Sequence, residues 1–172
     1  WSPSNQKENS PFRYFRSNML YPIGSISGRP EAHASNIIQG PCSKEKITLF
    51  TAWFCGTREG NLDVAIMFEM ISYQPKENLH EIEFHYTTPK IIADLPDRAC
   101  GNPVLFLAPN NILHLWFAGF FPRGSKDPDR LIYHQISSDL GETWTQPTIF
   151  SDRPGLWPRN NLIVLQDGDR KS

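Results

Sequence analysis

The stretch Ser137-Ser138-Asp139-Leu140-Gly141-Glu142-Thr143-Trp144 indicates how this chain folds. A strand-like run, 130–138, leads into it, and a second run, 146–151, leaves it. Both runs contain short stretches of β-branched and aromatic residues, as strands do. The sequence therefore predicts that these eight residues form the turn of a β-hairpin.

Each fixed position in this stretch has a physical role in such a turn. Asp139 can accept hydrogen bonds from backbone N–H groups across the turn, and Ser137 and Thr143 can add weaker bonds of the same kind. Gly141 supplies a residue that adopts positive φ without strain. The ring of Trp144 is expected to cover neighbouring strands, with its indole N–H donating to a carbonyl.

The pattern Ser-x-Asp-x-Gly-x-Thr-Trp resembles the Asp-box, also called the bacterial neuraminidase repeat, of sialidase-type β-propellers. Five fixed positions within eight residues make this resemblance far more specific than a lone turn motif. In that family the box lies on the rim, between the third and fourth strands of a blade and away from the pocket. The resemblance therefore implies an architecture, and it assigns the box a structural role.

Short apolar runs separated by turn-forming residues fill the rest of the chain. Its fifteen prolines and eleven glycines favour an all-β meander over helices. The expected strands are 33–39, 47–54, 64–72 and 90–94 in a first set, 102–108, 112–121, 130–138 and 148–151 in a second, and 160–166 at the start of a third. The sets look like a repeat, in which Ile47–Phe54 aligns with Ile112–Gly119. In the first set, Tyr73–Leu79 stands where the box belongs, so the box there is degenerate or replaced by a longer loop.

Four-stranded repeats of this kind are the blades of a β-propeller. We expect an irregular segment over 1–31 and a partial propeller over 32–172, with blade one at about 32–95, blade two at about 101–152 and the start of blade three at about 158–168. Sialidase-type propellers have six blades, so the resemblance implies an N-terminal part that needs further C-terminal blades to close.

Composition excludes several classes of function. A net charge of −1 over 172 residues provides no basic excess for binding nucleic acid. No apolar run is long enough to span a membrane.

The three cysteines, Cys42, Cys55 and Cys100, form neither a disulfide framework nor a zinc pattern, and buried free thiols are the expected state of Cys55 and Cys100. His80, His85, His114 and His134 lack metal-ligand spacing, and phosphate loops and nucleophile elbows are absent, so no metal or cofactor is expected. The chain begins with Trp1 and shows no signal segment, so its compartment stays unknown.

The loop that follows the second expected strand holds the strongest candidates for chemistry. Arg58, Glu59 and Asp63 lie close together there, between two apolar strands. A solvated hairpin loop is the structural alternative. The resemblance favours a site, because sialidases carry an arginine in this loop and, a few residues later, an aspartate that is the general acid/base. Arg58 and Asp63 match those positions, and the resemblance covers 33 to about 168.

One position departs from the family pattern. Sialidases carry the first of three carboxylate-clamping arginines on the first inner strand, where guanidinium matches carboxylate in bidentate geometry. This chain has Glu31-Ala32-His33-Ala34-Ser35 at that place. His33 is compatible with three roles: an anion ligand when protonated, a proton carrier, or a hydrogen-bonded strand histidine. Because of this departure, the sequence leaves open whether the substrate is sialic acid.

Two further polar stretches, 97–102 and 157–161, lead into the strands expected at 102–108 and 160–166. Asn102, Arg159 and Asn160 are candidate partners for sugar hydroxyls, and turn formation is the alternative for each. Together with Arg58 and His33 they form the expected substrate-binding set, beside Asp63 and Glu59 as catalytic candidates. The resemblance implies an exo-acting, sialidase-like glycoside hydrolase whose nucleophile lies in later blades. The rivals are a propeller hydrolase for another sugar and a propeller that binds glycans or proteins without cutting.

Overall fold

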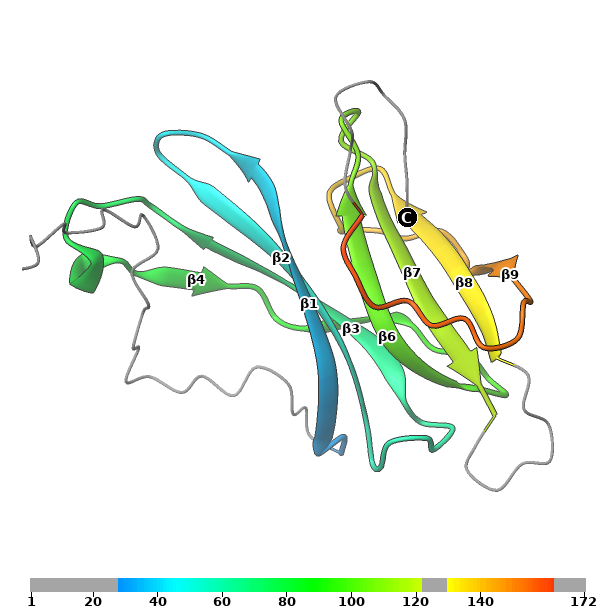
Figure 1. Cartoon of the computed structure of the whole chain (residues 1–172). Coiled ribbons are helices and arrows are strands. Elements are labelled where there is room, and N and C mark those ends of the chain that lie inside the picture. The colour runs from blue at the N-terminus through cyan, green and yellow to red at the C-terminus, as the bar shows by residue number, and fades with distance from the viewer. Residues whose placement is uncertain (1–27, 122–129, 163–172) are drawn as a thin grey trace, which may run out of the picture.

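The chain folds into antiparallel β-sheets. In the structure, a computed structural model that describes residues 28–121 and 130–162, two sheets lie side by side (Figure 1). The one helical element in the described residues is a short 3-10 turn, Leu79–Glu81. The expected all-β class is confirmed.

The first sheet contains five strands and the second contains four. The first is built from β1 (Glu31–Cys42), β2 (Ile47–Gly56), β3 (Ala65–Tyr73), β4 (Phe84–Tyr86) and β5 (Lys90–Ala93). The second is built from β6 (Ala99–Leu107), β7 (Leu113–Phe120), β8 (Arg130–Ser137) and β9 (Thr148–Ser151). Every pairing is antiparallel. The second sheet is a meander of hairpins, whereas in the first sheet β5 pairs with β3 instead of β4.

The main core lies between the two sheets. Residues of β2 and β3 face it at every second position, as the pleat of a strand requires. The buried members from the first sheet include Phe50, Ala52, Phe54, Ile66 and Phe68, and those from the second include Leu105, Leu113, Leu115 and Phe117. Burial of these side chains is what holds one sheet against the other.

The octapeptide forms the turn between β8 and β9, as expected. Asp139 is its hub, because its carboxylate accepts bonds from the Ser137 hydroxyl at 2.7 Å, the Thr143 N–H at 2.8 Å and the Thr143 hydroxyl at 2.5 Å. Gly141 adopts φ +97° and donates its N–H to Ser137 Oγ at 2.7 Å. The indole N–H of Trp144 donates to the Gly141 carbonyl at 3.2 Å.

This turn also packs against the other sheet. The Trp144 ring meets Phe68 of β3 edge to face, with centroids 5.6 Å apart. On the same side, Lys90 Nζ donates to the Glu142 carbonyl at 2.9 Å. The turn therefore joins the two sheets as well as closing a hairpin.

Asp139 is expected to make the stability of the chain depend on acid pH. Its hydrogen bonds from the Thr143 side chain and backbone, and then from Ser137, hold the pKa of Asp139 well below its usual range. A depressed carboxyl pKa adds stability that is complete above the unfolded value of about 3.9 and is lost as the pH falls through the lower folded value. Thermal unfolding of Asp139→Asn should therefore show a lower Tm at pH 7 and a smaller loss of Tm between pH 5 and pH 3 than the wild type.

Asp152→Asn is the matched control, because Asp152 is exposed and lies outside the turn. It should follow the wild-type curve at each pH. Equal acid sensitivity in the wild type and Asp139→Asn would show that the acid-labile group lies elsewhere.

The structure also corrects parts of the sequence interpretation. The first sheet carries an additional strand, β4, which shares the outer edge of β3 with β5: β4 pairs with Ile71–Tyr73 and β5 with Ile66–Phe68. A longer loop with a 3-10 turn and β4 therefore replaces the Asp-box there. Of the strand expected at 160–166, residues 160–162 are described and are not in a strand, and the rest lies outside the described residues.

Cys55 and Cys100 are buried free thiols, as expected, and Cys42 is an exposed one.

Candidate functional site

The loop between β2 and β3 is ordered by its own hydrogen bonds. Asp63 accepts the Thr57 N–H at 2.8 Å on one oxygen and the Thr57 hydroxyl at 3.0 Å on the other. Asn61 adds a bond from its side-chain amide to Thr57 Oγ1 at 3.0 Å. Arg58 and Glu59 lie at the exposed tip of this loop. The loop thus presents Asp63 in one defined position, with Arg58 and Glu59 nearby in sequence.

Arg29, which is not among the predicted site residues, anchors this loop. Its guanidinium donates to the backbone carbonyls of Asp63 and Cys55, which lie at the two ends of the loop. It also pairs with the carboxylate of Asp94 at 3.5 Å, and its side chain is only 21% exposed. A partly buried guanidinium that binds two carbonyls and a carboxylate restricts the positions of all three. No local motif marks this residue, because its partners are distant in the chain.

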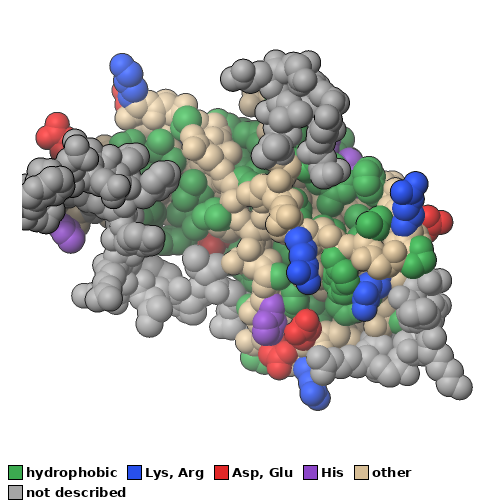
Figure 2. Space-filling model, viewed as in Figure 1, with side chains coloured by type: hydrophobic (Ala, Val, Ile, Leu, Met, Phe, Trp, Pro, Cys, Tyr) green, Lys and Arg blue, Asp and Glu red, His purple; other side chains and the backbone are tan. Residues whose placement is uncertain are grey.

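Glu31 and His33 reach the same loop from the start of β1. Glu31 Oε2 accepts the backbone N–H of Glu59 at 2.7 Å and lies 3.9 Å from Nε2 of His33. The imidazole stacks on Phe54, with centroids 5.6 Å apart, and remains 47% exposed. Figure 2 shows histidine and acidic side chains side by side at the lower end of the molecule, where β1 begins in Figure 1. An exposed imidazole beside a carboxylate is an arrangement that can carry a proton.

Three other expected binding residues, Asn102, Arg159 and Asn160, make no hydrogen bond or ion pair with this loop within the part of the chain that the structure describes. Asn102 is half-buried in a β-bulge of β6 with φ +49°, a conformation that asparagine tolerates better than most residues. Arg159 and Asn160 are exposed. Their neighbour Asn161 instead accepts a 2.5 Å bond from Asn36, whose side-chain oxygen accepts the Leu105 N–H at 2.9 Å. These bonds link β1, β6 and the segment after β9.

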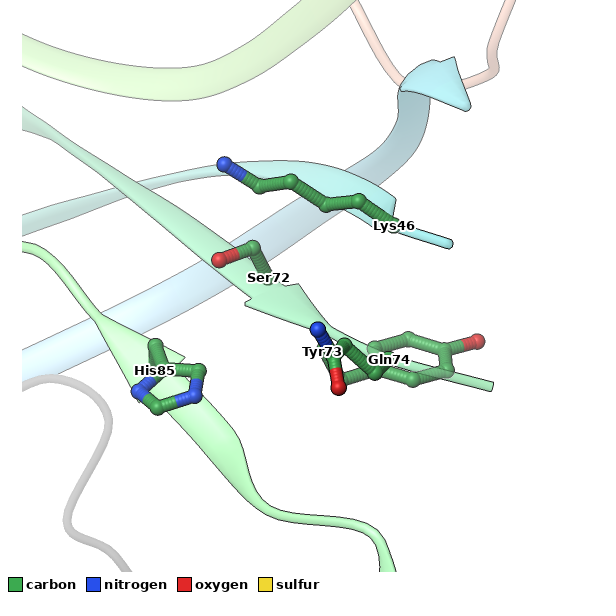
Figure 3. Close-up of a pocket in the computed structure, with 5 residues that line it drawn as sticks. All are labelled: Lys46, Ser72, Tyr73, Gln74 and His85. Atoms are coloured by element: carbon green, nitrogen blue, oxygen red, sulfur yellow. The ribbon is translucent and has the colours of Figure 1, made fainter. Parts of the chain in front are cut away.

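Two shallow hollows lie away from Asp63. One, of about 310 Å³, is bounded by β1, β6 and the residues Asn161 and Leu162. The other, of about 270 Å³, lies at the outer end of the first sheet and is lined by Lys46, Ser72, Tyr73, Gln74 and His85 (Figure 3). In Figure 3 the Tyr73 ring points away from the side on which Lys46 and Ser72 extend. Neither hollow contains the expected catalytic residues.

The buried thiols are unsuited to nucleophilic chemistry. Burial raises the pKa of Cys55, and it raises the pKa of Cys100 to about 12. The thiolate is the reactive form of cysteine, so both groups are held in the inert form. In 28–121 and 130–162, no three His, Cys, Asp or Glu side chains gather as a metal site requires.

Comparison with protein families agrees with the repeat architecture. The model of the BNR repeat-like domain matches residues 47–169, which is most of the chain. The chain belongs to the BNR repeat-like domain family. The comparison with curated proteins gave no match.

Family membership is consistent with both the turn and the sheets of this BNR repeat-like domain. The match begins at the first residue of β2 and includes the complete Asp-box turn. It also includes the β2–β3 loop with Asp63, whereas Arg29, Glu31 and His33 precede it. None of the described helical segments is long and apolar enough to cross a membrane.

Proposed function

We propose that this BNR repeat-like domain is part of a sialidase-like glycoside hydrolase that removes a terminal, acidic sugar. BNR repeat domains occur in sialidase-like glycoside hydrolases, which makes this class of enzyme the first to test. The observation that supports it best is the position of Asp63. This carboxylate is fixed by Thr57 on a loop that Arg29 and Glu31 hold against the start of β1.

Each candidate residue has a role in this proposal. Asp63 acts as general acid/base at the glycosidic oxygen, and Glu59 is a second carboxylate within the same loop. Arg58 and His33 contact the acidic group of the sugar, and Asn102, Arg159 and Asn160 contact hydroxyls. The nucleophile and the remaining carboxylate-binding arginines belong to further blades of a propeller, which the proposal requires for activity.

A second candidate function is a propeller that binds glycans without cutting them. It is favoured by one specific observation: both oxygens of Asp63 accept hydrogen bonds from the same residue, Thr57. Such a carboxylate stabilises its own loop, and a purely structural role needs nothing more. A third candidate function is the hydrolysis of a non-sialic sugar, because His33 stands where sialidases have an arginine that binds the carboxylate of sialic acid.

The test is hydrolysis of a panel of chromogenic glycosides, which includes a sialoside, a uronide and neutral deoxyhexosides. We expect the complete protein to release chromophore from an acidic glycoside and the 172-residue chain alone to release none, because the proposal assigns the nucleophile to further blades. Turnover by the 172-residue chain would overturn the proposed division of the site between blades. Binding of glycans by the complete protein without turnover of any substrate would support the second function instead.

A further inference from the structure

The face of the first sheet that forms the core changes character towards the outer end of that sheet. On β2 and β3 this face carries Phe50 and Phe68, which are both buried between the sheets. Side chains on one face of a strand recur at every second residue, so the same face of β3 continues through Met70 to Ser72. Apolar side chains are therefore followed on this face by a hydroxyl group.

Two further elements bring polar side chains to the same end of the sheet. β4 pairs with the outer end of β3 and places His85 directly opposite Ser72. Residues that are paired in this way have side chains on the same face. Lys46 immediately precedes β2, and Figure 3 shows its side chain extending over β3 on the side to which the Ser72 hydroxyl points.

These side chains surround a hollow of about 270 Å³. Its lining consists of Lys46, Ser72, Tyr73, Gln74 and His85 (Figure 3). Ammonium, hydroxyl, amide and imidazole groups can all donate hydrogen bonds, and none of the five lining residues is acidic. The second sheet does not repeat this arrangement, because the strand that supplies His85 has no counterpart there.

The donors around the hollow are not used by the rest of the described chain. Within 28–121 and 130–162, no salt bridge or side-chain hydrogen bond engages Lys46, Ser72 or His85. Lys90 provides a contrast, since its ammonium donates to the Glu142 carbonyl and lies 3.4 Å from the Glu142 carboxylate. The hollow therefore combines a positive charge with several donors that no described protein group satisfies.

We propose that this hollow is a binding site for a tetrahedral oxyanion, phosphate or sulfate, either as the free ion or as a group carried by a larger molecule. Lys46 supplies the positive charge, as lysine does at other phosphate sites. Ser72, Gln74 and His85 supply further hydrogen bonds, and these donors come from different strands, which suits oxygens that point in several directions. A planar carboxylate is matched best by the fork of an arginine, and no arginine lines the hollow.

This site is separate from the loop that carries Asp63. Lys46 precedes the first residue of β2, whereas the loop follows the last residue, Gly56. A rise of about 3.3 Å per residue puts about 30 Å between the two ends of this strand. The inference therefore does not depend on a catalytic role for Asp63.

Titration of inorganic phosphate against the complete protein, followed by the linewidth of the phosphate phosphorus NMR resonance, tests the proposal. At constant ionic strength we expect saturable broadening, which inorganic sulfate reverses by competition and chloride does not. Lys46→Gln should weaken phosphate binding at least about fivefold, because it removes a charge-assisted hydrogen bond. Ser72→Ala removes a neutral donor and should weaken it about threefold.

Lys44→Gln is the matched control. Lys44 is exposed in the turn between β1 and β2 but does not line the hollow. The variant changes the net charge by the same amount as Lys46→Gln and should weaken phosphate binding less than about twofold, because salt screens an exposed charge that makes no direct contact. Equal losses in the two lysine variants would overturn the site, since they would show only a general attraction between charges. Broadening that does not saturate, or that sulfate fails to reverse, would overturn it as well.

Phenyl phosphate in the same experiment identifies the source of the oxyanion. Binding at least as tight as that of inorganic phosphate, with the same dependence on Lys46, would support a phosphate group carried by a larger molecule. Weaker binding than that of inorganic phosphate would support the free ion. None of these measurements uses glycoside turnover, so the oxyanion site and the proposed function can fail separately.

Discussion

Replacing Gly141 with alanine is expected to destabilise the chain by at least about 2 kcal/mol, because two independent costs add at this position. Gly141 has φ +97°, a conformation that strains any residue with a side chain. A Cβ at this position would also lie 2.5 Å from Cε1 and Cζ of Phe68. Phe68 is buried between the sheets, so its ring has no free space into which to move. Urea unfolding, followed by circular dichroism, measures the change.

Gly155→Ala separates the two costs. Gly155 also has a positive φ, +79°, but no atom lies within 4 Å of the Cβ that alanine would add. Gly155→Ala should therefore lower the free energy of unfolding only by the cost of backbone strain, about 1 kcal/mol. Equal destabilisation by the two substitutions would mean that the Asp-box turn does not press against Phe68 as described.

The second large effect concerns catalysis by the complete protein. If Asp63 is the general acid/base, Asp63→Asn should lower kcat about 10²–10⁴-fold, the usual contribution of such a group. The substitution is nearly isosteric, and the remaining carbonyl oxygen can still accept one of the two Thr57 hydrogen bonds. Arg29 binds the Asp63 backbone carbonyl, which the substitution leaves in place. The loop should therefore stay folded, and glycan affinity should change little.

Asp97→Asn is the matched control. Asp97 is 68% exposed and touches Arg98 only at 4.0 Å, so its charge should be dispensable. Steady-state kinetics on the best substrate of the glycoside panel, with a thermal melt of each variant, give the comparison. Activity of Asp63→Asn within threefold of the wild type would remove Asp63 from the chemistry and favour the binding function.

Much of the fold could be predicted because its signals are local. The hydrogen bonds of the Asp-box turn join residues only two to four positions apart, so the identities of Ser137, Asp139 and Thr143 carry the geometry with them. Apart from β4, the strands of the described residues were predicted within a few residues at each end, because short apolar runs bounded by turn-forming residues are visible in the sequence. The all-β class followed from these two features.

Alignment between the repeats was wrong by one residue. In the alignment of the two repeats by sequence, Trp53 is equivalent to Ala118. In the structure, the bulges at Ala34 and Asn102 make Ala52 equivalent to Trp116, which puts Trp53 at the position of Phe117. Because side chains alternate across a strand, a slip of one residue moves every side chain to the opposite face.

The amino-acid sequence by itself determined the turn chemistry, the strand pattern and the loop that contains Arg58, Glu59 and Asp63. These features depend on neighbours in the chain, so the residues that specify them stand together. Only the tertiary structure decided that Arg29 clamps this loop and that Gly141 presses on Phe68. Both contacts join residues that lie far apart in the sequence. Their partners are chosen by the packing of the two sheets, and no local pattern encodes that packing.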